Sequence, residues 1–247
     1  MAHPRISAFL SGGERSGRLI IFDKDGTLID FHAMWGGWIV ELARRLEQAS
    51  GEPVAARLFA TVGYDAATGK VDPGGPLAIA AMADLRALTA EVLRAAGLPQ
   101  ARADAAAADA WQMPDPVALA RPLAALPALF GELRARGSRI AIATTDDRAP
   151  TAATVAALGV ARYVDALACG DDGHALKPAP DAILRLCREL DIAPAQAAMV
   201  GDTAADLRMG RAAGAGLTVG VLSGVGTAAV LAPYADAILP SVGELLG

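Results

Sequence analysis

The chain has 247 residues, 53% of them hydrophobic and only 4% aromatic, which is enough for one large core or for one core with a smaller second domain. Its formal net charge is −5, and no basic stripe or block occurs, so the sequence argues against a nucleic acid or an anionic membrane as partner. The first seventeen residues contain a predicted turn at Ser11-Gly12-Gly13 and lack the apolar stretch of a signal peptide. No run approaches the length of a membrane span, so we expect a cytoplasmic protein.

The first predicted strand ends in two carboxylates, since residues 20–28 read Ile-Ile-Phe-Asp-Lys-Asp-Gly-Thr-Leu. An apolar run of this kind is typical of a buried parallel strand, and open α/β sheets place their active sites at the carboxyl ends of such strands. Two acids as close as Asp23 and Asp25 require a cation or a proton between them where water is excluded. Mg²⁺ meets this need because it prefers oxygen ligands and is often shared with a substrate phosphate. An ordinary acidic turn is the alternative.

Residues 31–116 are rich in alanine, leucine and arginine at helical spacing. About 120 residues separate Asp23 from Thr144, far more than a single crossover between strands needs. We therefore predict a helical domain over residues 31–116, inserted into a core made of residues 1–30 and 117–247. Breaks between its helices are expected at segments that contain Gly and Pro, namely 51–53, 72–76 and 97–99.

Predicted strands and helices alternate in the remainder of the chain. The strands are expected near residues 139–144, 164–169, 197–201 and 217–221. The helices are expected near residues 151–158, 179–190 and 203–213. This alternation predicts an α/β fold with a doubly wound, Rossmann-like parallel sheet.

Further polar groups follow the later apolar runs. Thr144 ends the predicted strand at 139–144 and is followed by Thr145, Lys177 precedes a helix, and Asp202 ends a third strand with Asp206 four residues on. A hydroxyl, an ammonium group and a second acidic pair are the groups that a phosphoryl-transfer site needs. They occur in order along the chain, each at the end of a predicted strand or the start of a predicted helix.

Each of these residues also has a structural interpretation. The hydroxyl of Thr144 could bond to its own backbone, and Asp202 with Thr203 could form only a helix N-cap, with Asp206 facing the positive end of the helix dipole. Lys177 could be a solvated loop residue. The lysine usage favours a specific role, because only three of the 22 basic residues are lysines and two of these lie within the motifs.

Together the motifs resemble the haloacid dehalogenase-like hydrolase superfamily and, within it, the phosphoglycolate phosphatase-like branch. The resemblance runs through most of the chain from Arg18 onward and rests on four motifs: residues 22–28, Thr144-Thr145, Lys177-Pro178 and residues 201–206. It implies that the inserted helices form a mobile cap, which closes over the site, excludes water and supplies specificity.

The resemblance also implies roles for the two acids of the first motif. Asp23 would be the nucleophile that becomes an aspartyl-phosphate, and Asp25 the acid/base that protonates the leaving oxygen and then activates water. Members that cleave carbon–halogen bonds lack an acid at the position of Asp25, so its presence favours phosphoryl transfer.

By the same resemblance the chain binds Mg²⁺ and a phosphoryl group. The carboxylates of Asp23 and Asp202 and the backbone carbonyl of Asp25 would hold the ion, while Asp206 would orient bound water or a ligand. The phosphoryl oxygens would be bound by Thr144, Thr145 and Lys177.

Substrate contacts within the cap are harder to predict. Trp35 and Trp38 are spaced three residues apart on the first predicted cap helix, which favours packing over substrate contact, and Trp111 is the third tryptophan of the region. His32 follows the predicted hinge, and Lys70 lies in a glycine-containing loop that could reach the substrate.

The leading hypothesis is a Mg²⁺-dependent phosphatase that hydrolyses a small phosphorylated metabolite, phosphoglycolate-like or sugar-phosphate-like, as a monomer or homodimer. Three alternatives stay open. A phosphonate hydrolase would form a Schiff base on Lys70. A sugar-phosphate mutase would use the same acids, and a non-catalytic interaction module would use none of them.

Overall fold

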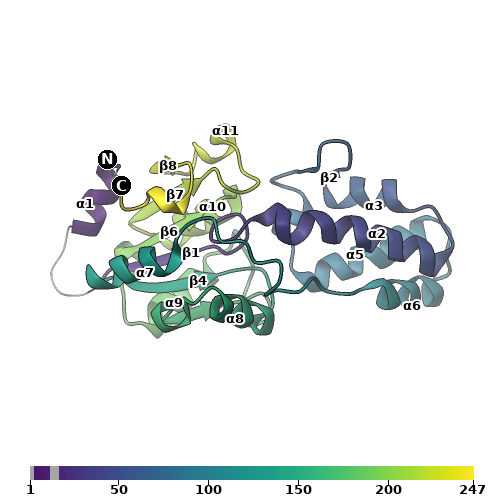
Figure 1. The fold of residues 1–247 in the computed structure, drawn as a ribbon, viewed down its shortest axis with the longest axis horizontal. Coiled ribbons are helices and arrows are strands. Elements are labelled where there is room, and N and C mark those ends of the chain that lie inside the picture. Colours follow the sequence, from purple (N-terminus) through teal and green to yellow (C-terminus); the bar gives the residue numbers. More distant parts are fainter. Residues whose placement is uncertain (1–2, 12–16) are drawn as a thin grey trace.

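The computed structural model describes residues 3–11 and 17–247 and contains a six-stranded parallel sheet (Figure 1). The strands are β1 Leu19–Phe22, β4 Arg139–Ala143, β5 Ala166–Ala168, β6 Ala197–Gly201, β7 Leu217–Val221 and β8 Ala237–Leu239. They follow the order β5-β4-β1-β6-β7-β8, so the first strand of the chain lies in the middle of the sheet. With helices on both faces, this arrangement confirms the predicted α/β fold with a Rossmann-like core.

The central strand β1 determines where the motifs meet. All four of its residues are buried, as expected for an apolar strand that is covered on both faces. Phe22 lies opposite Ile142 of β4 on one side and Val200 of β6 on the other. Because parallel strands end at the same edge of a sheet, the residues that directly follow these three strands come together: Asp23, Thr144 and Asp202.

One hydrophobic cluster holds helices against each face of the sheet. Side chains alternate along β1, so Phe22 stacks on Phe130 at 5.1 Å between ring centroids, while Ile21 belongs to the opposite cluster with Ile183. The helices of this part of the chain are α1 Pro4–Ser11, α7 Leu126–Ala135, α8 Arg148–Ala157, α9 Asp181–Glu189, α10 Ala204–Ala213 and α11 Ala228–Leu231. Short 3₁₀ turns lie at Ala161–Tyr163, Pro194–Gln196 and Val242–Glu244.

The elements predicted for this part are present within a few residues of their expected bounds, with α8, α9 and α10 as the three helices. Helices α1, α7 and α11 and the three-residue strand β8 were not predicted. Ser11, expected in a turn, is the last residue of α1, and the other residues of that turn, Gly12 and Gly13, lie outside the described residues. Among the residues described, no helix combines the length and the apolar character needed to cross a membrane.

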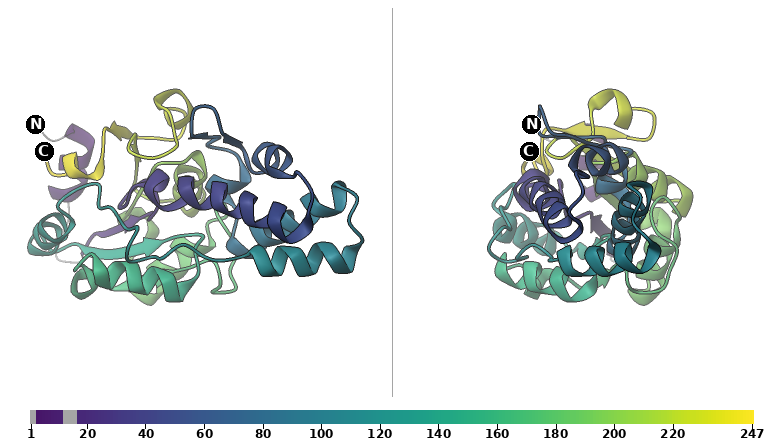
Figure 2. Two further views of the ribbon diagram at one scale, coloured as in Figure 1. Left: turned by 45° about the vertical axis from the view of Figure 1, so that its right-hand side comes forward. Right: turned by 90° about the vertical axis from the view of Figure 1, so that its right-hand side faces the viewer.

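Residues 32–110 form the helical region, which extends to one side of the sheet in the left-hand view of Figure 2 and lies in front of the sheet in the right-hand view. Its elements are a π-helical segment His32–Gly36, α2 Gly37–Ser50, α3 Ala55–Val62, β2 Tyr64–Asp65, β3 Lys70–Val71, α4 Pro76–Ile79, α5 Met82–Ala95 and α6 Gln100–Ala110. The three predicted breaks fall where helices end or begin. The small antiparallel hairpin of β2 and β3 was not predicted, because two-residue strands carry no readable alternation.

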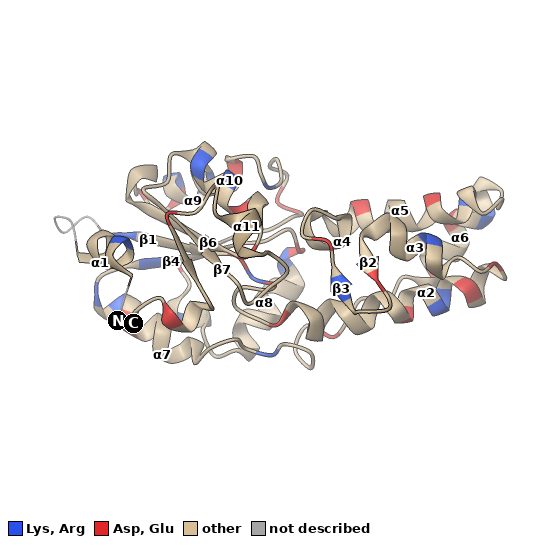
Figure 3. Ribbon diagram, turned by 90° about the horizontal axis from the view of Figure 1, so that it is seen from above, with Lys and Arg blue, Asp and Glu red and all other residues tan. Residues whose placement is uncertain are grey.

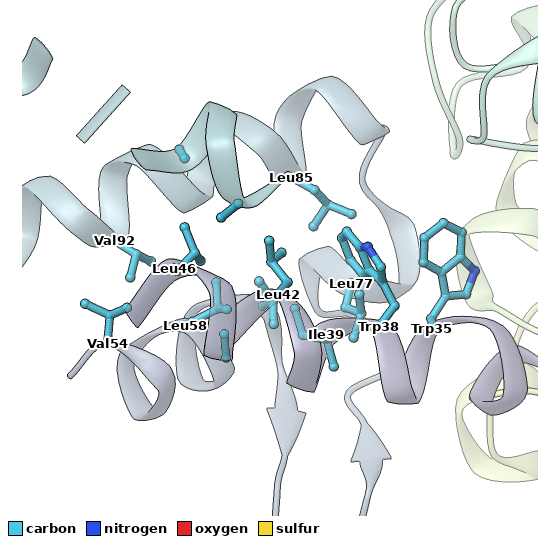
Figure 4. Packing of buried hydrophobic residues seen from close by; sticks show 14 of the residues in the cluster. Trp35, Trp38, Ile39, Leu42, Leu46, Val54, Leu58, Leu77, Leu85 and Val92 are labelled. Carbon is cyan, nitrogen blue, oxygen red and sulfur yellow. The ribbon is translucent and has the colours of Figure 1, made fainter. Parts of the chain in front are cut away.

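The helical region has a hydrophobic cluster of its own. In Figure 4, Trp38, Leu42 and Leu46 of α2 lie in a row that faces Leu85 and Val92 of α5. Every buried member of this cluster falls between residues 29 and 110, and none belongs to the clusters on the sheet. This separation supports a distinct unit, although the domain bounds at residues 31 and 116 stay a prediction.

The chain enters and leaves the helical region through two adjacent segments. The backbone N–H of Asp30 donates to the carbonyl of Arg121 at 2.8 Å, and that of Leu123 donates to Leu28 at 3.0 Å. The two segments that connect the helical region to the sheet are therefore held side by side.

Candidate active site

Three of the predicted acids form a compact cluster at the carboxyl edge of the sheet. Asp23 follows β1, Asp202 follows β6, and Asp206 lies in the first turn of α10. One carboxylate oxygen from each lies within 4.8 Å of the others, and each residue is at most 7% exposed. The backbone N–H of Asp23 donates to the carbonyl of Val200 at 2.9 Å, so hydrogen bonding between β1 and β6 continues up to Asp23.

The cluster is also part of a helix cap. Thr203 is the N-cap of α10, and its side chain accepts a hydrogen bond from the N–H of Asp206 at 3.3 Å, while Asp206 Oδ2 accepts from the N–H of Thr203 at 3.0 Å. Asp206 is therefore part of the helix cap, as its structural interpretation expected. The cap uses only Oδ2 of Asp206, and the other carboxylate oxygen, Oδ1, faces the site.

Lys177 joins two of the acids. Its Nζ lies 2.5 Å from Asp23 Oδ1 and 2.6 Å from Asp206 Oδ1, and its side chain is 7% exposed. Burial alone would lower the pKa of Lys177, but the carboxylates of Asp206 and Asp23 outweigh burial and raise that pKa above its ordinary value. Lys177 is thus a buried, charged partner of the acids and not a solvated loop lysine.

The acids still carry more negative charge than Lys177 balances. Burial raises the pKa of Asp23 to about 7, in spite of the opposing effect of Lys177. Burial also raises the pKa of Asp202, and the neighbouring charge of Asp23 raises it further. A buried all-oxygen cluster with an excess of negative charge has the donor set that suits a hard divalent cation such as Mg²⁺, so these residues fit the predicted ion.

Asp25 lies apart from this cluster and pairs with a residue that the sequence analysis did not assign. Its Oδ2 lies 2.5 Å from Nζ of Lys24, and its buried Oδ1 accepts no hydrogen bond from the described residues. Lys24 is 2% exposed and also pairs with Asp146 at 2.9 Å. Lys24 therefore holds Asp25 beside Asp146, the second residue after Thr144. The scarcity of lysine was the only sequence signal for this contact.

A glycine-containing loop after β7 encloses Asp202 and was also missed. The N–H of Val225 donates to Asp202 Oδ2 at 2.8 Å, and the hydroxyl of Thr27 donates to Oδ1 at 3.4 Å. A Cβ atom at Gly224 would overlap with the Asp202 carboxylate, and one at Gly226 with its backbone carbonyl. Both positions therefore have to be glycine for the loop to approach Asp202 this closely.

Thr144 and Thr145 follow β4 on the other side of the cluster. The hydroxyl of Thr144 accepts a hydrogen bond from the N–H of Asp146 at 3.2 Å, so the expected bond to local backbone does form. The hydroxyl hydrogen can still be donated elsewhere. Both threonines face the same cavity as the acids.

A narrow cavity of about 30 Å³ lies between the acids and the helical region. All seven predicted site residues line it. Its other lining residues are Phe31, Trp35, Leu77, Ala78, Ile79, Ala80, Met82, Asp146, Thr203, Ala205 and Val225. Figure 3 shows acidic segments at the end of the sheet that faces the helices.

Of the residues considered for substrate contact in the helical region, only Trp35 lines the cavity. Trp35 lines the cavity and also makes an edge contact with Trp38, whereas Trp38 and Trp111 pack against each other inside the helical region, with 5.3 Å between ring centroids. His32 and Lys70 are exposed and do not line the cavity. Sequence reasoning treated Trp35 and Trp38 alike, because their spacing does not reveal which one lies at the end of the cluster nearest the sheet (Figure 4).

Comparison with known proteins agrees with this architecture. The sequence profile of a family described as haloacid dehalogenase-like hydrolase matches residues 18–214. A phosphoglycolate phosphatase of Rhodospirillum rubrum is 31% identical, with 82% of this chain and 78% of that protein covered. A plasmid phosphoglycolate phosphatase of Cupriavidus necator is 34% identical over 46% of this chain and 49% of its own length, so the chain spans about half of that relative.

A solved phosphatase from Thermococcus onnurineus shares the fold, with a TM-score of 0.64 at 18% identity over 92% of this chain and 95% of that chain. The match over most of the chain, the parallel sheet and the order of the motifs agree with one another. The chain therefore belongs to the haloacid dehalogenase-like hydrolases, in their phosphoglycolate phosphatase-like branch.

Proposed function

We propose that the protein is a Mg²⁺-dependent phosphomonoester hydrolase that acts on a small phosphorylated metabolite through an aspartyl-phosphate. The observation that carries this proposal is the position of Asp23, a buried carboxylate in the cavity wall, paired with Lys177 and within 4.8 Å of two further acids. Membership in the family and relatives named as phosphoglycolate phosphatases support it.

In this proposal the reaction has two displacements at phosphorus. A carboxylate oxygen of Asp23 forms a bond to phosphorus as the bond to the leaving oxygen breaks, and Asp25 gives that oxygen its proton. Asp25 then accepts a proton from a water molecule, whose oxygen attacks the phosphorus and releases Asp23 with inorganic phosphate. The pairing of Asp25 with Lys24 sets its position beside the cavity before substrate binds.

The phosphoryl oxygens would be held by the groups that surround Asp23. Lys177 would offset their negative charge, and the hydroxyls of Thr144 and Thr145 would donate to them. The carboxylates of Asp23 and Asp202 and the backbone carbonyl of Asp25 would hold Mg²⁺, with Asp206 beside it. When bound, the ion would neutralise charge on the phosphoryl group.

The structure offers little support for the phosphonate hydrolase alternative. Its Schiff base requires an accessible lysine in the cavity, but Lys70 lies outside the lining, and the amines of Lys24 and Lys177 are both engaged in ion pairs. A mutase and a hydrolase would use the same acids, and kinetics separates them. A non-catalytic module gives no reason for an intact set of charged groups buried around one cavity.

Release of inorganic phosphate with and without Mg²⁺ tests the proposal. Asp23→Asn should keep the fold but lower kcat by several orders of magnitude, because an amide is a poor nucleophile. Asp84→Asn, an exposed change of the same kind, serves as the control and should retain activity. Substantial turnover by folded Asp23→Asn would refute the mechanism, and a phosphorylated intermediate should be detected by mass spectrometry only when Asp23 is present.

A further inference from the structure

The wall of the cavity that comes from the helical region is apolar. It is made by residues such as Trp35, Leu77, Ile79 and Met82. Among the described residues that line the cavity from positions 31–116, none carries a charged, hydroxyl or amide side chain, and the indole nitrogen of Trp35 is the one polar side-chain atom. The side chains on this wall therefore offer a substrate almost no hydrogen-bonding partners.

The opposite wall is strongly acidic. Five carboxylates and one ammonium group, that of Lys177, line the cavity, and the second ammonium, that of Lys24, lies behind them between two of the acids. A bound divalent cation would leave the acids with residual negative charge. The phosphoryl group adds further negative charge, so a second anionic group on the substrate would be repelled and would find no cation on the apolar wall.

The N-terminal turn of α5 is the polar feature nearest this wall. Its first residue, Met82, lines the cavity, and its free N–H groups would be a candidate for binding a carboxylate. The turn already carries an acid, Asp84, which compensates the helix dipole and disfavours a further anion. The N-terminus of α5 supplies at most a partial positive charge, which Asp84 partly offsets, and no full cation.

We infer that the leaving group of the substrate is uncharged and apolar, so that short alkyl or aryl phosphomonoesters are favoured over phosphates bearing a carboxylate, such as phosphoglycolate. This inference rests on the proposed phosphatase activity and narrows its substrate class. Burial of carbon against Trp35 and Ile79 favours such a group, whereas a carboxylate or several hydroxyls would lose water without gaining partners.

The wild-type protein provides the first test. With Mg²⁺ present, kcat/KM is measured for butyl phosphate, phosphoglycolate, glucose 6-phosphate and phosphocholine, with p-nitrophenyl phosphate as a general substrate. We expect butyl phosphate to exceed phosphoglycolate by roughly tenfold or more. A preference for phosphoglycolate, glucose 6-phosphate or phosphocholine, or equal values, would overturn the inference and leave a phosphatase. No hydrolysis of any ester would overturn the proposed function, and the inference with it.

A cation placed in the wall provides the second test. Ile79→Arg should supply the missing partner and reduce the ratio of kcat/KM for butyl phosphate over phosphoglycolate by roughly tenfold. Val40→Arg adds the same charge at a position that is 46% exposed and outside the cavity, so it should leave the ratio unchanged. Equal effects of the two variants would overturn the inference. Ala78→Arg replaces Ile79→Arg if circular dichroism shows that the latter does not fold.

Discussion

Replacing Lys24 by methionine should destabilise the protein markedly. The ammonium of Lys24 lies 2.5 Å from Asp25 and 2.9 Å from Asp146, and the residue is 2% exposed. Lys24→Met keeps much of the apolar stem but leaves two buried carboxylates with no shared cation. Removing one partner of a buried ion pair costs roughly 3–5 kcal/mol. For a chain of this length that corresponds to a decrease in Tm of roughly 6–20 °C.

The loss of stability caused by Lys24→Met should depend on pH. Burial raises the pKa of Asp146 to about 6 in spite of Lys24, and removing Lys24 should raise that pKa further. A carboxyl group whose pKa is higher in the folded than in the unfolded state binds more protons when the protein is folded. Its cost to stability is therefore greatest at high pH. The cost vanishes as the pH falls below the pKa of the group in the unfolded state, about 3.9. The Tm deficit of Lys24→Met should therefore be larger at pH 8 than at pH 5.

Thermal unfolding followed by circular dichroism measures both effects. Lys70→Met, an exposed lysine of the helical region, is the matched control and should change stability by no more than about 0.5 kcal/mol. The double variant Lys24→Met/Asp146→Asn should recover part of the loss, because one unpaired charge is removed. A Tm unchanged at pH 8, or a deficit independent of pH, would show that Lys24 does not neutralise these acids.

Three further predictions concern the acids and their supports. Mg²⁺ should raise Tm more at pH 8 than at pH 5.5, because the raised pKa values of Asp23 and Asp202 make their repulsion largest when both are ionised, and Asp202→Ala should remove the Mg²⁺ effect. Asp25→Asn should still bind Mg²⁺ in calorimetry, because residue 25 binds through its backbone carbonyl. The variant should slow hydrolysis of alkyl phosphates more than that of p-nitrophenyl phosphate, and the reverse pattern would exclude Asp25 as the acid. Gly224→Ala should abolish Mg²⁺-dependent turnover by displacing Asp202, whereas Gly37→Ala, where a Cβ meets nothing within 4 Å, should not; full activity in folded Gly224→Ala would contradict the packing described.

Local sequence patterns determined the central part of the fold. The apolar runs before Asp23, Thr144 and Asp202 each predicted a buried strand, and each strand forms where expected. Because such strands run parallel, their carboxyl ends had to share an edge of the sheet, so the meeting of these three residues followed from the sequence alone. The helix breaks in residues 31–116 were equally local, since Gly and Pro act on their own backbone.

Only the tertiary structure decided which distant groups meet. The Lys24 side chain contacts Asp146, Val225 binds the Asp202 carboxylate, and Trp35 lines the cavity while Trp38 does not. A periodic pattern reports which face of an element is apolar, but not which neighbour that face will meet or how far along the cluster a side chain lies. Which apolar side chains form the cavity wall depends on how the helices pack and on the angle at which they reach the sheet. Those are properties of many weak contacts between segments far apart in the chain, and no single stretch of sequence records them.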